Sequence, residues 1–277
     1  LASSAASDVY KRQLVSQSGE TADTKAALHL AHDLGADTLG IVNAKGSAIA
    51  READMVLYTH AGPEISVAST KAYMVQLAVF YLLAFRLSYV RGAITEEQCM
   101  SYTEKLLGIP ELIEKILEKP ETCQFAASRL VADEHLLYIG RGLDYALSME
   151  GSLKLKEISY IHSESYAAGE LKHGTISLIT EDMPVIAVAT QRDVLDKTVS
   201  NIKEVKSRGA FTIVVTREGT DFDKDVADIL VTVPETDDLL MPMTAVVPLQ
   251  LIAYYTADLR GNDVDKPRNL AKSVTVE

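Results

Sequence analysis

An internal repeat limits this chain to a small set of folds. Sliding the chain on itself by 174 residues aligns short matching segments and the strand-like stretches beside them. The aligned pairs are Asp33–Gly35 with Ser207–Gly209 and Ala53–Met55 with Ala227–Ile229, and at this offset the strand-like stretches Thr38–Asn43 and Phe211–Thr216 overlap to within one residue. Apolar helices that end at Gly92 and Gly261 correspond at a shorter offset, so one loop has lost residues. The repeat predicts two copies of one α/β unit.

Within each copy, strand-like and helix-like segments alternate with short connections. The first copy is expected to contain a helix at Thr21–Leu34, a strand at Thr38–Val42, a helical turn at Ser47–Ala53, a strand at Met55–Tyr58 and a long helix at Val67–Arg91. The second copy is expected to contain strands at Leu136–Ile139, Val185–Ala189, Phe211–Thr216 and Ile229–Val233, and helices from Gly142 to Glu157 and over Asp193–Arg208 and Met243–Leu259. This alternation predicts parallel sheets covered by helices on both faces, in three α/β/α layers.

The copies suggest a division of the chain. We predict a first domain over 14–93, incomplete at its start, a helical linker over 94–126, a second domain over 127–262 and a tail over 263–277 that completes the site. Residues 1–13 show no apolar stretch of the kind found in signal peptides. Asp8–Gln13 resembles the translated end of a sequencing adapter, so we expect native sequence to begin at Leu14.

Composition narrows the class of protein and its partners. Hydrophobic residues make up 47% and charged residues 24%, which is ordinary for a globular chain. The net charge of −12 argues against nucleic acid and against an anionic membrane surface as partners. Cys99 and Cys123 form neither a disulfide framework nor a metal-ligand pattern, which favours a reduced, cytoplasmic protein. The apolar run Leu77–Phe85 is too short to span a bilayer, so we expect a buried helix and no membrane anchor.

The segment Leu14–Thr21, L-V-S-Q-S-G-E-T, has the composition of a phosphate-binding loop. If a helix follows, Ser16, Ser18 and Thr21 cluster at its N-terminus, where free N–H groups and the helix dipole favour an anion. Gly19 lets the backbone approach a ligand closely. The alternative is that Ser18 or Thr21 is only an N-cap.

The second copy helps to choose between these alternatives. Thr190-Gln191-Arg192 replaces Ser16-Gln17-Ser18 there, and the glycine is absent. A feature that is needed only for folding should tend to survive in both copies, whereas a ligand-binding loop can persist in one. This comparison favours the phosphate-binding interpretation.

A second group of polar residues lies in the second copy. On a helix, Glu150, Lys154 and Glu157 share one face, and such triplets are usually solvated ion pairs. The following stretch, 158–174, is not periodic and is dense in acid and base groups that could move protons between adjacent carbons. Five of the six histidines receive no role: His29, His32, His60, His135 and His162.

Two further features of the sequence can be interpreted in more than one way. The Gly140-Arg-Gly142 turn is an incomplete dinucleotide-binding pattern, which we do not adopt. The tail around Lys272 is either a disordered terminus or a flexible segment that brings a lysine into a closed site for Schiff-base chemistry. Ligands of such sheets bind at the carboxyl ends of the strands, where Ser16, Asn43 and Gly140 are expected.

Five sequence blocks stand out along the chain: Ser16–Thr21, Val67–Lys71, Glu150–His162, Ala167–Gly174 and Asp263–Glu277. In the same order, they resemble blocks of the isomerase half of the glutamine:fructose-6-phosphate aminotransferases, which contains two sugar isomerase (SIS) domains. The resemblance runs from Leu14 to the end of the chain. It implies an enzyme, an aminotransferase and ketose–aldose isomerase, that makes glucosamine-6-phosphate from fructose-6-phosphate without a metal or organic cofactor.

The resemblance also implies roles for individual residues. His173 would open the sugar ring, Lys272 would form a Schiff base with the open ketose, and Glu157, assisted by Lys154, would move a proton between C1 and C2. The sugar phosphate would be held by Ser16, Gln17, Ser18 and Thr21, in a site lined by Val67 and Ala271. In the family, the residue corresponding to His173 reaches the neighbouring subunit's site, so a homodimer is expected.

This chain departs from the family pattern in what precedes Leu14. The glutaminase domain that supplies ammonia and the start of the first SIS domain are missing from it, so the fragment alone is expected to be weak or inactive. Two alternatives stay open: a non-catalytic SIS-type sugar-phosphate-binding regulator, and a related sugar-phosphate isomerase or deaminase. A regulator would need the phosphate loop but not Glu157, His173 or Lys272.

Overall fold

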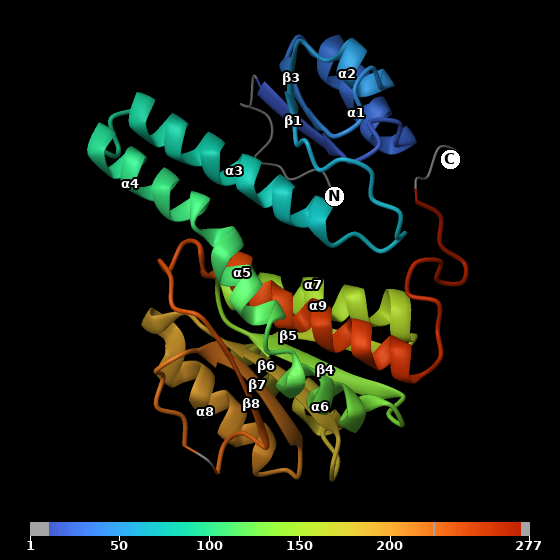
Figure 1. The fold of residues 1–277 in the computed structure, drawn as a ribbon, viewed down its shortest axis with the longest axis vertical. Helices are drawn as coiled ribbons and strands as arrows, with labels where there is room; N and C mark the ends of the chain where they lie inside the picture. The colour runs from blue at the N-terminus through green and yellow to red at the C-terminus, as the bar shows by residue number, and fades with distance from the viewer. Residues whose placement is uncertain (1–10, 224, 273–277) are drawn as a thin grey trace. The chain divides into compact units, whose positions relative to one another are not determined.

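The computed structural model describes residues 11–223 and 225–272, and these form two compact units. Unit 1 comprises the chain up to Ala93 together with the tail from Arg268, and unit 2 comprises Ile94–Pro267. The residues predicted to form a helical linker belong to unit 2 by this division. Each unit is an α/β structure (Figure 1), so the predicted fold class is confirmed.

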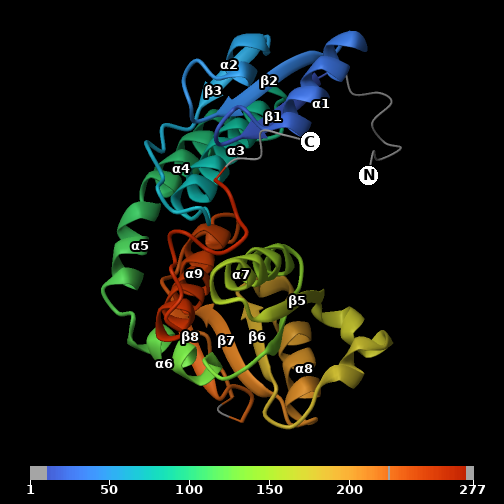
Figure 2. The ribbon, with the colours of Figure 1, turned by 90° about the vertical axis from the view of Figure 1, so that its right-hand side faces the viewer.

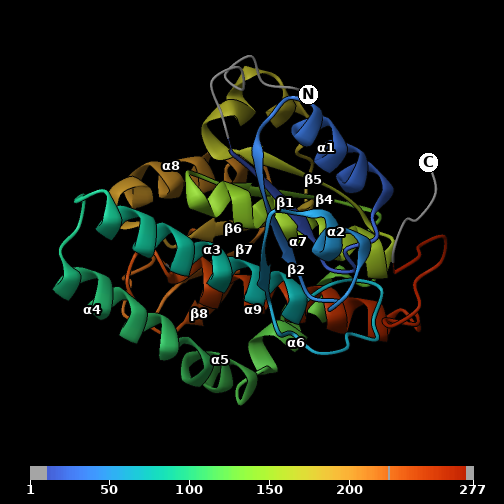
Figure 3. The ribbon, with the colours of Figure 1, turned by 90° about the horizontal axis from the view of Figure 1, so that it is seen from above.

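Unit 1 is built on a three-stranded parallel sheet with the order β1-β2-β3. Its elements are β1 (Lys11–Ser16), α1 (Ala22–Asp33), β2 (Asp37–Val42), α2 (Ala48–Glu52), β3 (Met55–Tyr58) and α3 (Lys71–Val90). The helices α1 and α2 contact each other beside the strands that they connect (Figure 3). A small core of Leu14, Leu28, Val42 and Ile49 lies between these helices and the sheet.

The first strand starts earlier than the predicted native sequence. Lys11 pairs with Asp37 and Gln13 pairs with Leu39 in the ladder between β1 and β2. Residues 11–13 therefore belong to the sheet although they were assigned to a non-native leader, and residues 1–10 lie outside the described part of the chain. Parallel pairing uses backbone groups, so it leaves the origin of these residues untested.

The expectation of a buried helix at Leu77–Phe85 is wrong for most of α3. Ala72 and Phe85 are its buried residues, and Leu82 and Leu87 are exposed. By length and composition alone, α3 could cross a membrane, a test that core helices also pass. Its counterpart in the repeat, α9 (Met241–Leu259), is buried along most of its length by neighbouring helices. The sequence of α3 is therefore that of a core helix, but unit 1 supplies few partners for it.

Unit 2 begins with three helices and continues into a five-stranded parallel sheet with the order β5-β4-β6-β7-β8. Its remaining elements are α4 (Glu96–Leu107), α5 (Ile109–Leu117), α6 (Glu121–Leu130), β4 (His135–Gly140), α7 (Leu143–Ser159), β5 (His162–Ala167), β6 (Pro184–Ala189), α8 (Leu195–Lys206), β7 (Phe211–Arg217) and β8 (Ile229–Val233). The helices α7 and α9 pack together on one face of the sheet and α8 covers the other (Figures 1 and 2). The central strand β6 is buried throughout, as its continuous apolar sequence requires.

The repeat is visible in the strand order. The strands β6, β7 and β8 correspond to β1, β2 and β3, whereas β4, β5 and α7 have no counterpart among the described residues of unit 1. The long helix predicted from Val67 begins at Lys71, because residues 59–70 form a loop after β3. The edge strand β5 was not predicted.

Candidate functional site

The loop after β1 forms a cluster of hydroxyl groups. Ser16 is buried at the end of the strand, and its Oγ lies 2.9 Å from Oγ1 of Thr21. The backbone N–H of Gly19 donates to Ser16 Oγ at 3.0 Å, and the N–H of Glu20 donates to Ser18 Oγ at 3.1 Å. Gly19 has a φ of +68°, which bends the loop back on itself. We call residues 16–21 the hydroxyl loop.

The Thr21 side chain does not cap α1. Thr21 occupies the N-cap position of α1, but its side chain makes no capping hydrogen bond and contacts Ser16 instead. Glu20 turns toward another helix, because its Oε1 accepts the N–H of Ala48 at the start of α2. The hydroxyl groups therefore gather at a helix N-terminus, where an anion is favoured.

Two buried polar atoms, one within the hydroxyl loop and one beside it, are unsatisfied. Within the described residues, Oε1 of Gln17 and Oγ of Ser47 have no hydrogen-bond partner. Ser47 touches the loop, because a Cβ added to Gly19 would lie only 2.0 Å from Ser47 Oγ. Unpaired buried polar atoms are costly, and a polar ligand at this loop would give them partners. Nε2 of Gln191, the counterpart of Gln17 in unit 2, is also unsatisfied among the described residues, so Ser47 Oγ carries more of this argument than Gln17 does.

In unit 2 the corresponding loop is filled by the protein itself. The buried carboxylate of Asp144 accepts the N–H of Thr190 at 2.7 Å, the hydroxyl of Thr190 at 2.5 Å and the N–H of Gln191 at 3.1 Å. Burial raises the pKa of Asp144 above its ordinary value, against the effect of these hydrogen bonds. Nearby, the guanidinium of Arg217 is buried and donates to Thr190 O. An internal carboxylate thus takes the anion position in the second copy.

The loop after β3 lies at the same edge of the sheet as the hydroxyl loop. The N–H of Asn43, which follows β2, donates to Gln17 O at 3.3 Å. The Asn43 side chain accepts the N–H of Ala61 at 2.8 Å and donates to Gly62 O at 2.9 Å. Val67 is on this loop, half-buried. Residues 59–70 are therefore tied to the carboxyl ends of the strands, where ligands of parallel sheets bind.

The C-terminal tail brings Lys272 to the same loop. Its Nζ lies 2.7 Å from Oε2 of Glu64 and donates to Ser66 O at 2.6 Å. Ala271, immediately before it, is exposed. Unit 1 therefore contains the residues that were predicted to bind the phosphate, to line the site and to supply the amine. Glu64 was not predicted, and the signal that could have found it is an acidic residue shortly before the start of a long helix.

Glu150, Lys154 and Glu157 lie together on α7 of unit 2. Nζ of Lys154 is 2.5 Å from Oε2 of Glu157 and 3.7 Å from Oε1 of Glu150, and only 6% of the Lys154 side chain is exposed. The alternative of a solvated ion-pair stripe is therefore wrong. Burial raises the pKa of Glu150 to about 6, which Lys154 opposes and Glu157 reinforces.

His173 lies apart from this triplet in the sequence. It ends a short 3₁₀-helix over Ala168–His173, which follows β5, and its side chain is exposed. Lys154, Glu157 and His173 all belong to unit 2, so their approach to the hydroxyl loop stays a prediction.

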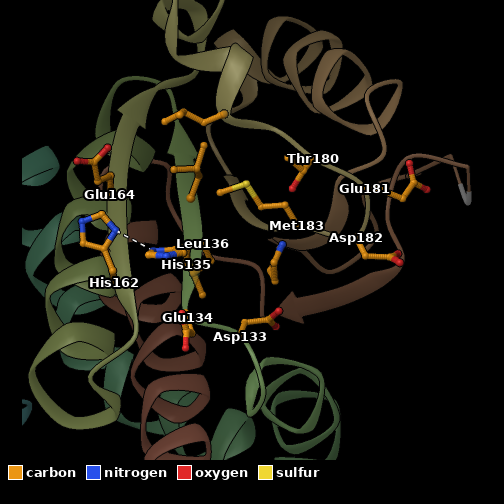
Figure 4. A pocket seen from close by; sticks show the side chains of 13 residues that line it. Asp133, Glu134, His135, Leu136, His162, Glu164, Thr180, Glu181, Asp182 and Met183 are labelled. Atoms are coloured by element: carbon orange, nitrogen blue, oxygen red, sulfur yellow. Dashed lines mark hydrogen bonds between the residues drawn. The ribbon is translucent and has the colours of Figure 1, made fainter.

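A cavity of about 620 Å³ lies at the opposite, N-terminal edge of the unit 2 strands. It includes His135 and His162, register partners at the start of β4 and β5, whose Nδ1 atoms are 3.4 Å apart (Figure 4). Several carboxylates surround them, but in the part of the chain that the structure describes no cluster of three or more ligand residues could hold a metal. The cavity contains none of the predicted site residues.

Comparison with known proteins agrees with this architecture. The family model described as "SIS domain" matches residues 14–86 and 130–259. Curated relatives from Clostridium acetobutylicum and Clostridium tetani, both called glutamine–fructose-6-phosphate aminotransferase [isomerizing], are 51% and 53% identical over 95% of this chain, which spans 43% of their length.

A solved structure of a protein with a similar name also matches this chain. The C-terminal domain of glucosamine-fructose-6-phosphate aminotransferase from Francisella tularensis is 37% identical, has a TM-score of 0.88 and is matched over 92% of this chain and 72% of that one. The chain therefore belongs to the SIS domain family, in the group formed by the C-terminal parts of glutamine–fructose-6-phosphate aminotransferases.

Proposed function

We propose that this chain is the isomerase part of an enzyme that converts fructose-6-phosphate and ammonia into glucosamine-6-phosphate. The observation that carries the proposal is that Lys272 and the hydroxyl loop share the carboxyl edge of one sheet in unit 1. If the hydroxyl loop held the phosphate of fructose-6-phosphate, the carbonyl end of the open-chain ketose would be free to reach the Lys272 amine. The names of the relatives, which print fructose-6-phosphate and an isomerizing aminotransferase, support this substrate and this class of reaction.

The residues would divide the work as follows. Neutral donors at the helix N-terminus hold the phosphate, and Ser16 and Thr21 orient toward it. The Lys272 amine condenses with the C2 carbonyl, forming a C=N bond and releasing water, and ammonia later displaces the lysine nitrogen at C2. Glu157 then moves a proton from C1 to C2 in the direction of synthesis, beside the positive charge of Lys154, and from C2 to C1 in the reverse direction. His173 assists ring opening, from a neighbouring subunit in a homodimer.

Unit 2 supports an enzyme more than a regulator. A sugar-phosphate sensor needs a phosphate loop, but it does not need a buried lysine between two carboxylates on α7. Removing the Lys154 ammonium from water costs free energy, and its ion pairs with Glu150 and Glu157 offset this cost. The relatives extend well beyond this chain, so the source of ammonia, a cytoplasmic location and weak activity of the chain alone stay predictions.

Calorimetric titration tests the proposal on this chain. Fructose-6-phosphate should bind and fructose should not, because the phosphate supplies most of the contacts. Ser16→Ala should weaken binding about tenfold through the loss of one hydroxyl contact to an anion. The matched control is Thr190→Val in the second copy, where Asp144 fills the loop. Equal weakening by both variants, each checked for folding by circular dichroism, would contradict this site.

A further inference from the structure

Glu64 is the acidic residue that joins the tail to the loop after β3. Only 4% of its side chain is exposed, whereas 32% of the Lys272 side chain is exposed. Oε2 of Glu64 contacts Lys272 Nζ at 2.7 Å and accepts the hydroxyl of Ser69 at 3.0 Å. The protein therefore holds the carboxylate by a contact that does not involve the lysine.

The other oxygen of Glu64 anchors the helix that follows. Oε1 accepts the N–H groups of Thr70 at 3.0 Å and Ala72 at 3.2 Å, at the start of α3. Thr70 stands at the N-cap position without a capping hydrogen bond of its own, so Glu64 caps α3 from the loop. Burial opposes ionisation of Glu64, but the contacts with Lys272, Thr70 and Ala72 hold its pKa below its ordinary value.

We propose that Glu64 is a positioning residue that seats Lys272 at the edge of the unit 1 sheet. The Glu64 carboxylate accepts hydrogen bonds from Ser69, Thr70 and Ala72, and it accepts a further one from Lys272, which lies on an irregular tail. Ser66 O adds a second, neutral acceptor for the same ammonium. Seating removes conformational freedom that the tail would otherwise lose during the reaction.

The charge on this pair is suited to imine formation, and in this respect the inference rests on the proposed function. A lysine ammonium and a ketone carbonyl give a protonated imine and water, so the C=O bond is replaced by C=N and the net charge at nitrogen stays +1. Glu64 therefore compensates one positive charge before and after the condensation. It touches neither the phosphate nor the reacting carbon in this scheme, and it acts through Lys272.

Lysine labelling without any sugar tests the seating alone. In trace acetylation followed by peptide mass spectrometry, Lys272 should react more slowly than the exposed Lys266 in the same tail. Glu64→Gln should raise the ratio of Lys272 to Lys266 labelling about tenfold, because the charge-assisted hydrogen bond is lost. The matched control is Glu20→Gln, which alters another loop carboxylate that caps a helix without holding a lysine. An unchanged ratio in the folded Glu64 variant overturns the inference.

A second variant keeps the test decisive if Glu64→Gln does not fold. Lys272→Met leaves the contacts of Glu64 with α3 intact and should accelerate tryptic cleavage after Arg268, because the tail loses its contact with Glu64. Cleavage at the wild-type rate overturns the inference.

A separate arm adds fructose-6-phosphate and a borohydride and measures the mass of one reduced hexose phosphate on Lys272. If labelling responds to Glu64→Gln but no adduct forms in the wild type, Schiff-base formation by Lys272 in this chain fails and the seating stands. If the wild type forms the adduct but labelling is unchanged, the proposed function stands and the seating fails.

Discussion

The carboxylate of Asp144 accepts both the backbone N–H and the hydroxyl of Thr190, at 2.7 and 2.5 Å. In the repeat, Thr190 corresponds to Ser16, whose hydroxyl contacts Thr21 and accepts from Gly19. The same position therefore binds a side-chain carboxylate in unit 2 and presents hydroxyl groups in unit 1. If unit 1 binds the sugar phosphate as proposed, this difference explains why the corresponding position of unit 2 would not.

Asp144→Ala should destabilise unit 2 by about 2–4 kcal/mol, because the N–H groups of Thr190 and Gln191 would be buried without acceptors. Asp144→Asn should cost less than about 1 kcal/mol. Its oxygen can accept the two N–H groups and its amide nitrogen can donate to the Thr190 hydroxyl. Burial raises the pKa of Asp144, which means that it disfavours the charged form, so a neutral replacement escapes the desolvation cost that the carboxylate bears.

Urea denaturation measures both variants, with the unit 2 transition assigned by hydrogen exchange of peptides from β6 and β7. Equal losses in the two variants would show that the negative charge itself is required. The carboxylate would then compensate a positive group such as Arg217 rather than fill the loop.

The repeat predicted the fold well because its evidence is spread over many residues. The strands expected at Thr38–Val42 and Met55–Tyr58 agree closely with β2 and β3. The edge strand β5, by contrast, reads H-S-E-S-Y-A, without the apolar alternation that marks a half-buried strand. Its pairing with β4 is set by tertiary structure, so local sequence could not show it.

The candidate site was predictable where chemistry is local and not where it depends on tertiary contact. The hydroxyl loop could be found because Ser16, Gly19 and Thr21 lie within six residues. Glu64 and Lys272 are far apart in sequence and meet only because the tail returns to unit 1. The exposure of α3 could not be predicted either, since its composition matches that of the buried α9 and only its lack of partners differs.

Stability of unit 2 should decrease as the pH rises through the range in which Glu150 titrates. Its pKa in the folded chain is about 6, above the ordinary value of 4.5, because its carboxylate is buried. The folded state therefore binds more protons between these values, and the contribution present below about pH 4.5 is lost as the pH passes 6. A shift of this size corresponds to about 2 kcal/mol.

Glu150→Gln removes this titration. The difference in unfolding free energy between wild type and variant, measured by urea denaturation from pH 4.5 to 7.5, should fall by about 2 kcal/mol. The matched control is Glu111→Gln on α5, an exposed carboxylate, for which the difference should stay flat. A flat difference for Glu150→Gln as well would mean that Glu150 titrates alike in the folded and unfolded states.

Gly19→Ala should damage unit 1 far more than Gly35→Ala, although the two glycines have nearly equal φ values of +68° and +71°. A Cβ at Gly35 meets no atom within 4 Å, so only backbone strain of about 1 kcal/mol is expected. A Cβ at Gly19 would lie 2.0 Å from Ser47 Oγ and 2.5 Å from Ser47 Cβ, which forces α2 away from the hydroxyl loop.

The expected additional loss for Gly19→Ala is about 2 kcal/mol or more, with at least tenfold weaker binding of fructose-6-phosphate. Hydrogen exchange of β1 and β2 peptides reports the stability of unit 1, and calorimetry reports binding. Combining Gly19→Ala with Ser47→Gly removes both clashing atoms, so the double variant should recover stability close to that of Gly35→Ala. If the second substitution restores nothing, the close approach of Ser47 is not what requires a glycine here, and the φ of +68° alone must account for it.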